Sequence, residues 1–277
     1  MTVTVTVQAG ASIADLLRNA PFDALDNRLL AAHALRLSRT ALITQSAHRL
    51  DVEEAARMTA AFTRRAAGEP VAYILGTREF YGLALKVTPD VLIPRADTEL
   101  LVELVLERAA PGATVADLGT GSGAIAIAVA RNRPDVQVTA TDASAAALEV
   151  AAQNAALHRV RLDLLQGDWY APIAERRFDI IAANPPYIRA GDVHLGQGDL
   201  PFEPVDALTD HADGLSALRS LAASAPAHLR TGGWLLLEHG YDQAAAVRML
   251  LIDAGLTDVA SWTDLSGIER VSGARLA

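Results

Sequence analysis

The feature that most constrains the fold is the regular alternation of short apolar segments with longer helical ones in the last two thirds of the chain. Strands are predicted at residues 114–118, 136–141, 162–166, 179–183 and 234–238. Helices are predicted around and between them, at residues 98–109, 125–132, 145–157, 215–228 and 242–253. Because strand–helix–strand units join parallel strands, this order predicts a doubly wound α/β sheet. A last apolar pair, residues 258–262 and 270–276, predicts an antiparallel hairpin at the sheet edge and brings the total to seven strands.

The first 76 residues carry helical patterns instead. Ser12 is placed to cap a short helix, and residues 22–36 carry an apolar stripe at helical spacing. Asp51 and Glu54 match a variant of the capping box at the start of a further helix. We therefore predict a small N-terminal helical bundle over residues 1–76.

A different pattern connects the two parts. Residues 77–95 include two apolar stretches around Thr-Pro-Asp at 88–90, which predicts a β-hairpin linker that turns there. The α/β domain then spans residues 96–277. The Thr/Val alternation at residues 2–7 is consistent with a strand and equally with a disordered extension.

Composition excludes several classes of protein. The chain has no cysteine, which rules out disulfides, thiolate metal sites and a cysteine nucleophile. The net charge of -9 argues against a generic nucleic-acid binder, which would neutralise phosphates with surplus Lys and Arg. No apolar run approaches the roughly 20 residues of a membrane span, and no histidine pair has metal-ligand spacing. We expect a cytoplasmic protein that uses no metal and binds neither membrane nor, directly, nucleic acid.

A glycine-rich loop, DLGTGSG at residues 117–123, follows a predicted strand and precedes a predicted helix. Gly119, Gly121 and Gly123 permit a tight turn and let a ligand approach the backbone closely. Asp142 ends the next strand, where an acid can accept both hydroxyls of a ribose. The dinucleotide pattern needs its third glycine one residue later, so the loop favours S-adenosylmethionine over nicotinamide or flavin. A purely structural turn is the third interpretation.

Asp168 and Trp169 follow the third strand of the α/β part. In this topology, that strand end faces the same crevice as the glycine loop. A carboxylate there can accept from an adenine amine, and an indole can cover a ring face. The alternative is a solvated aspartate beside a half-buried tryptophan.

The tetrapeptide Asn184, Pro185, Pro186 and Tyr187 comes directly after the strand at 179–183. Two consecutive prolines cannot extend the ladder, so the chain must turn out of the sheet at its carboxyl edge. A conjugated amine or amide nitrogen has a delocalised lone pair and must be oriented to accept a methyl group. The Asn184 side-chain oxygen and the Pro185 carbonyl can hold its two N–H groups while Tyr187 stacks on the planar group. Together with the glycine loop, this turn predicts a methyltransferase acting on a conjugated nitrogen, with Asn184, Pro185 and Tyr187 as catalytic residues.

Several segments together resemble the release-factor glutamine methyltransferases (the PrmC/HemK family). The matching segments are residues 68–82, GEPVAYILGTREFYG; residues 91–99, VLIPRADTE; the glycine loop; the NPPYI segment at 184–188; and blocks at 202–215 and 234–240. The resemblance covers almost the whole chain. One departure is Ala96, which stands where the family has a proline after Arg95.

The resemblance implies a seven-stranded, Rossmann-like S-adenosylmethionine-dependent methyltransferase domain and a helical domain that helps to hold the substrate. It implies transfer of a methyl group to the glutamine of the Gly-Gly-Gln motif in class I peptide-chain release factors, giving N5-methylglutamine. The residues implied for cofactor binding are Gly119, Thr120, Gly121, Ser122, Gly123, Asp142, Trp169 and Asn184. Those implied for the glutamine amide are Asn184, Pro185, Pro186 and Tyr187.

Two alternatives are kept. One is an amino-methyltransferase acting on adenine N6 or guanine N2 of a nucleic acid, because a base amine and a carboxamide present the same donors to this turn. The other is a catalytically silent scaffold that binds S-adenosylmethionine. Two further side chains are open: Glu203 either touches substrate or anchors a loop, and His239 is expected to make a structural hydrogen bond.

Overall fold

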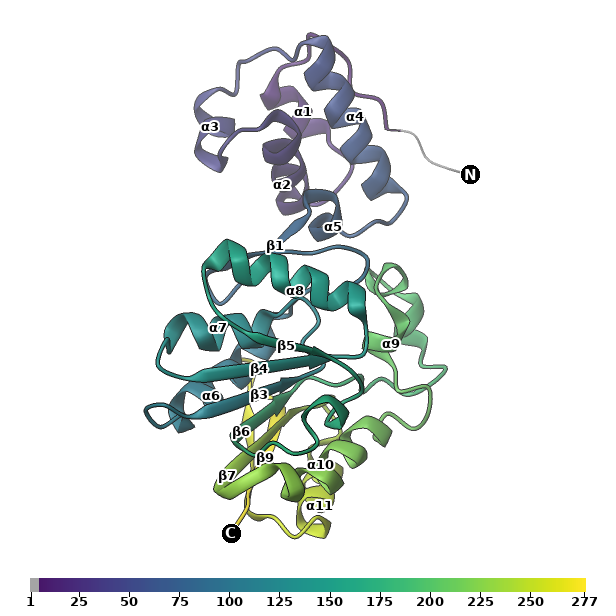
Figure 1. Cartoon of the computed structure of the whole chain (residues 1–277). Helices are drawn as coiled ribbons and strands as arrows, with labels where there is room; N and C mark the ends of the chain where they lie inside the picture. The colour runs from purple at the N-terminus through teal and green to yellow at the C-terminus, as the bar shows by residue number, and fades with distance from the viewer. Residues whose placement is uncertain (1–4) are drawn as a thin grey trace. The chain divides into compact units, whose positions relative to one another are not determined.

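The computed structural model describes residues 5–277 and divides the chain into two compact units, with the boundary between Thr77 and Arg78. The first unit is helical, and the second contains the sheet (Figure 1). No helix among residues 5–277 is both long and apolar enough to cross a membrane.

The N-terminal unit is built from five helices, α1 Ile13–Asn19, α2 Ala24–Leu35, α3 Arg39–Thr44, α4 Val52–Ala66 and α5 Val71–Leu75. Ser12 caps α1 by accepting from a backbone N–H, as predicted. The capping box of Asp51 and Glu54 at the start of α4 is confirmed in both directions. Leu30 and Phe62 lie in the buried core that joins these helices. Helices α3 and α5 were not predicted, because five or six residues are too few to display a helical period.

The segment before α1 forms no strand in its described part. Residues 2–4 lie outside the described residues. Val5 and Val7 pack against the helical core, and the Val7 N–H donates to Thr59 Oγ1 at 2.9 Å. From residue 5 onward the segment is therefore held by α4 and its neighbours and not by a sheet.

The hairpin at the start of the second unit differs from the prediction. Strands β1 Thr77–Phe80 and β2 Leu83–Lys86 are joined by Tyr81 and Gly82, both with positive φ, which is the geometry of a tight two-residue hairpin. A turn does form at residues 88–90, where the Val91 N–H donates to the Thr88 carbonyl at 3.1 Å, but it lies in the loop after β2, so its prediction as the turn of the hairpin was wrong. Asn154 on helix α8 (Ala145–His158) fixes the hairpin, since its side chain bonds both the N–H and the carbonyl of Lys86.

The second unit contains a seven-stranded sheet in the order β5-β4-β3-β6-β7-β9-β8. Its strands are β3 Thr114–Leu118, β4 Gln137–Asp142, β5 Asp163–Gln166, β6 Phe178–Ala183, β7 Leu229–Glu238, β8 Thr257–Thr263 and β9 Glu269–Arg275. The first five pair in parallel, and β9 pairs antiparallel with both β7 and β8. The predicted fold class, including the terminal hairpin, is confirmed. Strand order reverses beside β3, and in such sheets ligands bind outside the carboxyl ends of the strands at that point.

Helices cover both faces of this sheet (Figure 1). Helices α6 Glu99–Arg108, α7 Ala124–Asn132 and α8 contribute to one buried cluster, and helices α10 Ser216–His228 and α11 Ala244–Asp253 contribute to the other. Strand β7 begins five residues earlier than predicted. Gly232 and Gly233 interrupt the apolar pattern there and hide its first half from periodicity.

Short elements follow the Asn184 turn and were not predicted. They are η3 Val193–Gly196, η4 Leu200–Phe202 and α9 Val205–Leu208. An isolated β-bridge between Ile188 and Thr209 joins the two ends of the segment that contains these elements. A 3₁₀ turn, η1 Ala96–Thr98, leads into α6, and another, η2 Ala171–Ile173, follows β5.

Candidate active site

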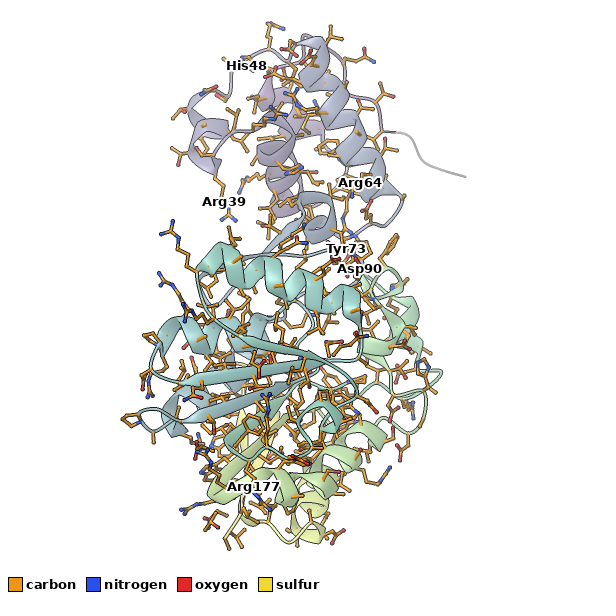
Figure 2. All side chains as sticks on the ribbon, in the orientation of Figure 1. Arg39, His48, Arg64, Tyr73, Asp90 and Arg177 are labelled. Atoms are coloured by element: carbon orange, nitrogen blue, oxygen red, sulfur yellow. The ribbon has the colours of Figure 1, made fainter. Side chains whose placement is uncertain are left out.

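A cavity of about 460 Å³ opens at the carboxyl edge of the sheet. Its walls come from the ends of four neighbouring strands, and its lining includes Gly119, Asp142, Trp169 and Asn184. Residues predicted from separate motifs are thus brought to one place. Asp90, which comes from the loop after β2 and is labelled in Figure 2, also lines this cavity.

The glycine loop after β3 is shaped by backbone geometry. Gly119, Gly121 and Gly123 all have positive φ, at 76°, 55° and 83°. A Cβ on Gly119 would lie 3.1 Å from the Trp169 ring, so this glycine keeps space at the cavity wall. A Cβ on Gly123 would lie 2.8 Å from Ile127 Cδ1, so that glycine instead permits close packing of the helix that follows.

Asp117, the acid that opens the glycine loop, is fully buried. Its Oδ2 accepts from Thr120 Oγ1 at 2.6 Å and from the Ala126 N–H at 3.2 Å, which ties the loop to the first turn of α7. Its Oδ1 has no hydrogen-bond partner within residues 5–277. Burial raises the pKa of Asp117 to about 6. Asp117 belongs to the glycine-loop motif but is not among the residues predicted to bind the cofactor.

Asp142 lies at the end of β4, where the motif reasoning expected a ribose-binding acid. Its Oδ2 accepts from the Gly121 N–H at 2.8 Å, and its Oδ1 accepts from the Ser144 N–H at 2.9 Å. Burial raises the pKa of Asp142. Ser144, and not Asp142, caps α8, because its side chain accepts from the Ala147 N–H.

Trp169 forms the part of the cavity wall beside the glycine loop. Its backbone has a positive φ of 42°, and its carbonyl accepts from Thr141 Oγ1 at 3.1 Å. The ring is half-buried and lies against Gly119, while Asp168 beside it is exposed and lines the same cavity. The arrangement leaves a flat aromatic surface beside a carboxylate.

The turn after β6 separates two spaces. Asn184 and Pro186 line the large cavity, while Asn184, Pro185 and Tyr187 line a smaller one of about 70 Å³. Asn184 Nδ2 donates to Thr98 Oγ1 at 3.1 Å, and the Tyr187 hydroxyl donates to Glu238 Oε1 at 3.5 Å. Asn184 and Ala207 line both spaces, and Asn184 is the one of the two with a polar side chain.

Glu238, at the end of β7, is a buried carboxylate behind this turn that sequence reasoning did not select. Burial raises its pKa to about 7, and hydrogen bonding from the Thr98 hydroxyl and the charge of Arg270 act in the opposite direction. Its Oε2 has no hydrogen-bond partner among the described residues. The available signal was an acid immediately after a run of large apolar residues, at the carboxyl end of a central strand.

Glu203 anchors a loop, which is one of the two roles predicted for it. Its side chain is fully buried, accepts from the Ile93 N–H at 2.9 Å and forms an ion pair with Arg95. These contacts hold the segment that carries Ala96 in place of the family's proline. His239 makes the expected structural hydrogen bond, with Nε2 2.8 Å from Ser272 Oγ. Within residues 5–277 there is no cluster of three His, Asp or Glu side chains suited to a metal ion.

Comparison with known proteins defines the class first. Residues 95–197 match the family model described as Methyltransferase small domain. Among solved structures, a methyltransferase from Pyrococcus furiosus aligns with a TM-score of 0.55 at 19% identity, over 76% of this chain and 95% of that one. A 16S rRNA N2 G1207 methyltransferase from T. thermophilus, in complex with AdoMet and guanosine, aligns with a TM-score of 0.54 at 21% identity, over 73% of this chain and 50% of that one. The chain has the fold of an S-adenosylmethionine-dependent methyltransferase.

The particular family follows from the sequence relatives. Residues 8–76 match the PrmC N-terminal domain model. The release factor glutamine methyltransferase of Burkholderia pseudomallei is 53% identical, over 99% of both chains. That of Bordetella pertussis is 52% identical, over 95% of this chain and 98% of its own length. That of Vibrio cholerae is 44% identical, over 98% of this chain and 96% of its own length. The chain belongs to the release factor glutamine methyltransferase family.

Proposed function

We propose that this protein transfers a methyl group from S-adenosylmethionine to the side-chain amide nitrogen, N5, of the glutamine in the Gly-Gly-Gln motif of class I release factors. The observation that carries the chemistry is the position of Asn184, which lines both the large cavity and the small one. A side chain between two spaces can hold an acceptor nitrogen on one side against a methyl donor on the other. Membership of the family supports the choice of substrate.

The large cavity fits the cofactor in shape and charge. Its described lining residues include no Lys or Arg but four aspartates, Asp90, Asp142, Asp168 and Asp206. This excess of negative charge is complementary to a sulfonium cation. Asp142 can still bind ribose hydroxyls, because each carboxylate oxygen can accept two hydrogen bonds and only one per oxygen is used.

The wall residues then position an adenosine. The Trp169 ring covers one face of the adenine, and the missing Cβ of Gly119 leaves room beside that ring. When bound, S-adenosylmethionine supplies a methyl group made electrophilic by its positively charged sulfur. The chain itself contributes orientation of the acceptor nitrogen, and the negative charge of the cavity contributes to binding of the sulfonium cation.

The Asn184 turn positions the glutamine amide. Since Asn184 Nδ2 is engaged with Thr98, its Oδ1 is left to accept one amide N–H, and the Pro185 carbonyl accepts the other. Tyr187 stacks on the planar carboxamide. With both N–H groups held, the nitrogen lone pair points at the methyl carbon. The N–C bond forms as the carbon–sulfur bond breaks, sulfur keeps that electron pair, and the surplus proton on nitrogen leaves to water.

The experiment is mass analysis of the Gly-Gly-Gln peptide of a purified release factor after incubation with the enzyme and S-adenosylmethionine. We expect the mass of one methyl group on the glutamine, and none with the Asn184→Ala variant. Parallel reactions with tRNA, rRNA and DNA test the amino-methyltransferase alternative. Methylation of a nucleic acid with an unmodified Gly-Gly-Gln peptide would overturn the proposal, and no methylation at all would support the silent scaffold.

A further inference from the structure

The orientation of the Asn184 amide matters because its two ends have opposite hydrogen-bonding character. Its oxygen accepts and its nitrogen donates, while the two orientations have nearly the same shape. Only an outward oxygen can hold an N–H of a substrate amide. In the structure, Nδ2 faces inward and donates to Thr98 Oγ1 at 3.1 Å.

Thr98 is an unusual residue to receive that bond. It occupies the N-cap position of α6, where a threonine hydroxyl usually accepts from the helix backbone. Here the side chain makes no capping hydrogen bond, although it is only 4% exposed. The hydroxyl is instead directed at Asn184 and at the carboxylate of Glu238.

A hydroxyl alone would not choose between the two Asn184 orientations, because it can donate or accept. The Glu238 carboxylate removes this freedom. An ionised carboxylate only accepts, so the Thr98 hydroxyl donates its hydrogen bond to Glu238, and the Thr98 oxygen is left to accept from Asn184 Nδ2. Glu238 also accepts from the Tyr187 hydroxyl, so one carboxylate supports both side chains of the turn.

We propose that Glu238 and Thr98 are positioning residues for methyl transfer, which act as a relay that keeps the Asn184 side-chain oxygen directed at the substrate amide. This inference rests on the proposed role of Asn184 as an acceptor. It gives the IPRADTE segment at residues 93–99 a part in orienting the catalytic turn, because Thr98 belongs to that segment. Neither residue touches the reacting atoms.

The relay makes turnover depend on the ionisation of Glu238. Once protonated, the carboxyl group donates to Thr98, Thr98 then donates to Asn184, and the amide reverses to present its NH₂ to the substrate. The charged and titratable groups that act on Glu238 are Arg270 from β9, Asp97 from η1 and Tyr187. Because burial raises the Glu238 pKa to about 7, we expect turnover at saturating cofactor to rise with pH through neutrality.

The test compares single-turnover methylation rates and substrate KM for two Thr98 variants and a control. Thr98→Val removes the hydroxyl but keeps the shape, and we expect at least a tenfold lower rate with little change in KM or cofactor affinity. Thr98→Ser retains the hydroxyl and should recover most of the lost rate. The matched control is Thr114→Val at the other end of the sheet, where the hydroxyl also bonds a carboxylate, that of Asp179, at 2.8 Å. This control should methylate at the wild-type rate.

The pH profile gives a readout that lost packing would not produce. Wild type should show a rise in rate near neutral pH, and Glu238→Gln, which cannot ionise, should be slower and lack that rise. If Thr98→Val matches wild type, or Thr98→Ser is as slow as Thr98→Val, the relay is wrong. If Asn184→Ala retains activity, the proposed role of Asn184 is wrong, and the relay, which depends on it, is wrong as well. If Asn184→Ala is inactive while the Thr98 and Glu238 variants match wild type, the role of Asn184 stands and only the relay is wrong. Should Thr98→Val not fold, the Thr98→Ser rate and the Glu238→Gln profile still decide.

Discussion

Two loops meet at the carboxyl edge of the sheet, and they are held in opposite ways. The glycine loop after β3 takes its shape from positive φ angles and from contacts with the adjacent strand, where the Gly119 and Thr120 N–H groups both donate to the Thr141 carbonyl. The turn after β6 instead depends on side chains from distant parts of the chain, Thr98 and Glu238. A loop of the first kind is sensitive to added atoms, whereas one of the second kind is sensitive to lost hydrogen bonds.

The largest expected effect tests the turn. Asn184→Ala removes one of the two acceptors that orient a delocalised amide, and loss of one preorganised hydrogen bond costs about 10²–10³ in rate. Fold and most of the cofactor affinity should be intact, because the Asn184 side chain makes one hydrogen bond to the protein, to Thr98. Single-turnover methylation of a release factor measures the rate, with circular dichroism as the folding control. A variant that keeps more than half of the wild-type rate would contradict the mechanism.

Asn184→Asp sharpens the same test. It keeps an acceptor of similar shape but adds a negative charge beside the cofactor. That charge favours the sulfonium ground state over the transition state, in which the positive charge on sulfur is being lost. We therefore expect cofactor binding to persist and turnover to fall. An active Asp variant would show that the amide is not required.

The next effect tests the glycine loop. Gly123→Ala should lower the free energy of unfolding by roughly 2–5 kcal/mol, because left-handed backbone costs about 1–2 kcal/mol and overpacking against Ile127 adds about 1–3 kcal/mol. Gly112→Ala is the matched control, with φ of 74° and nothing within 4 Å of the added Cβ. Urea unfolding of both variants separates the steric contribution from the backbone one. Equal losses would show that close packing at Gly123 is unimportant.

A smaller effect is expected for Asp142→Ala, which should weaken S-adenosylmethionine binding by about 1–3 kcal/mol as ribose hydroxyls lose their acceptor and the Gly121 N–H is freed. Isothermal calorimetry measures it. Asp135→Ala is the control, because Asp135 also accepts a backbone N–H, that of Gly112, but does not line the cavity. Unchanged affinity in the Asp142 variant would remove that residue from the site.

The smallest effect compares two changes of Tyr187. Tyr187→Phe keeps the ring and removes only the 3.5 Å hydrogen bond to Glu238. We therefore expect the activation free energy of methylation to rise by about 0.5–1.5 kcal/mol. Tyr187→Ala also removes stacking and should be slower. The rates are measured at saturating cofactor. Equal rates for the two variants would mean that the hydroxyl, and not the ring, carries the role of Tyr187.

Sequence alone determined the features that depend on neighbouring residues. Strand β3 has the predicted limits, and the capping box at Asp51 is as expected, since both are read from short-range patterns. The glycine loop and the Asn184 turn were recognisable for the same reason. That the loop and the turn face the same crevice then followed from the rule that parallel strands bring their carboxyl ends to one edge.

Tertiary structure decided what depends on contacts between distant residues. The hairpin turns at Tyr81 and not at 88–90, and Asn154 on α8 bonds the backbone of its second strand. Thr98 and Glu238 lie far from Asn184 in sequence, and in isolation they read as a helix cap and the acid at a strand end. Their hydrogen bonds exist only after the sheet brings the ends of β6 and β7 beside the start of α6. A hydroxyl and a carboxylate have no fixed role in sequence, because each takes its role from the partner that folding places against it.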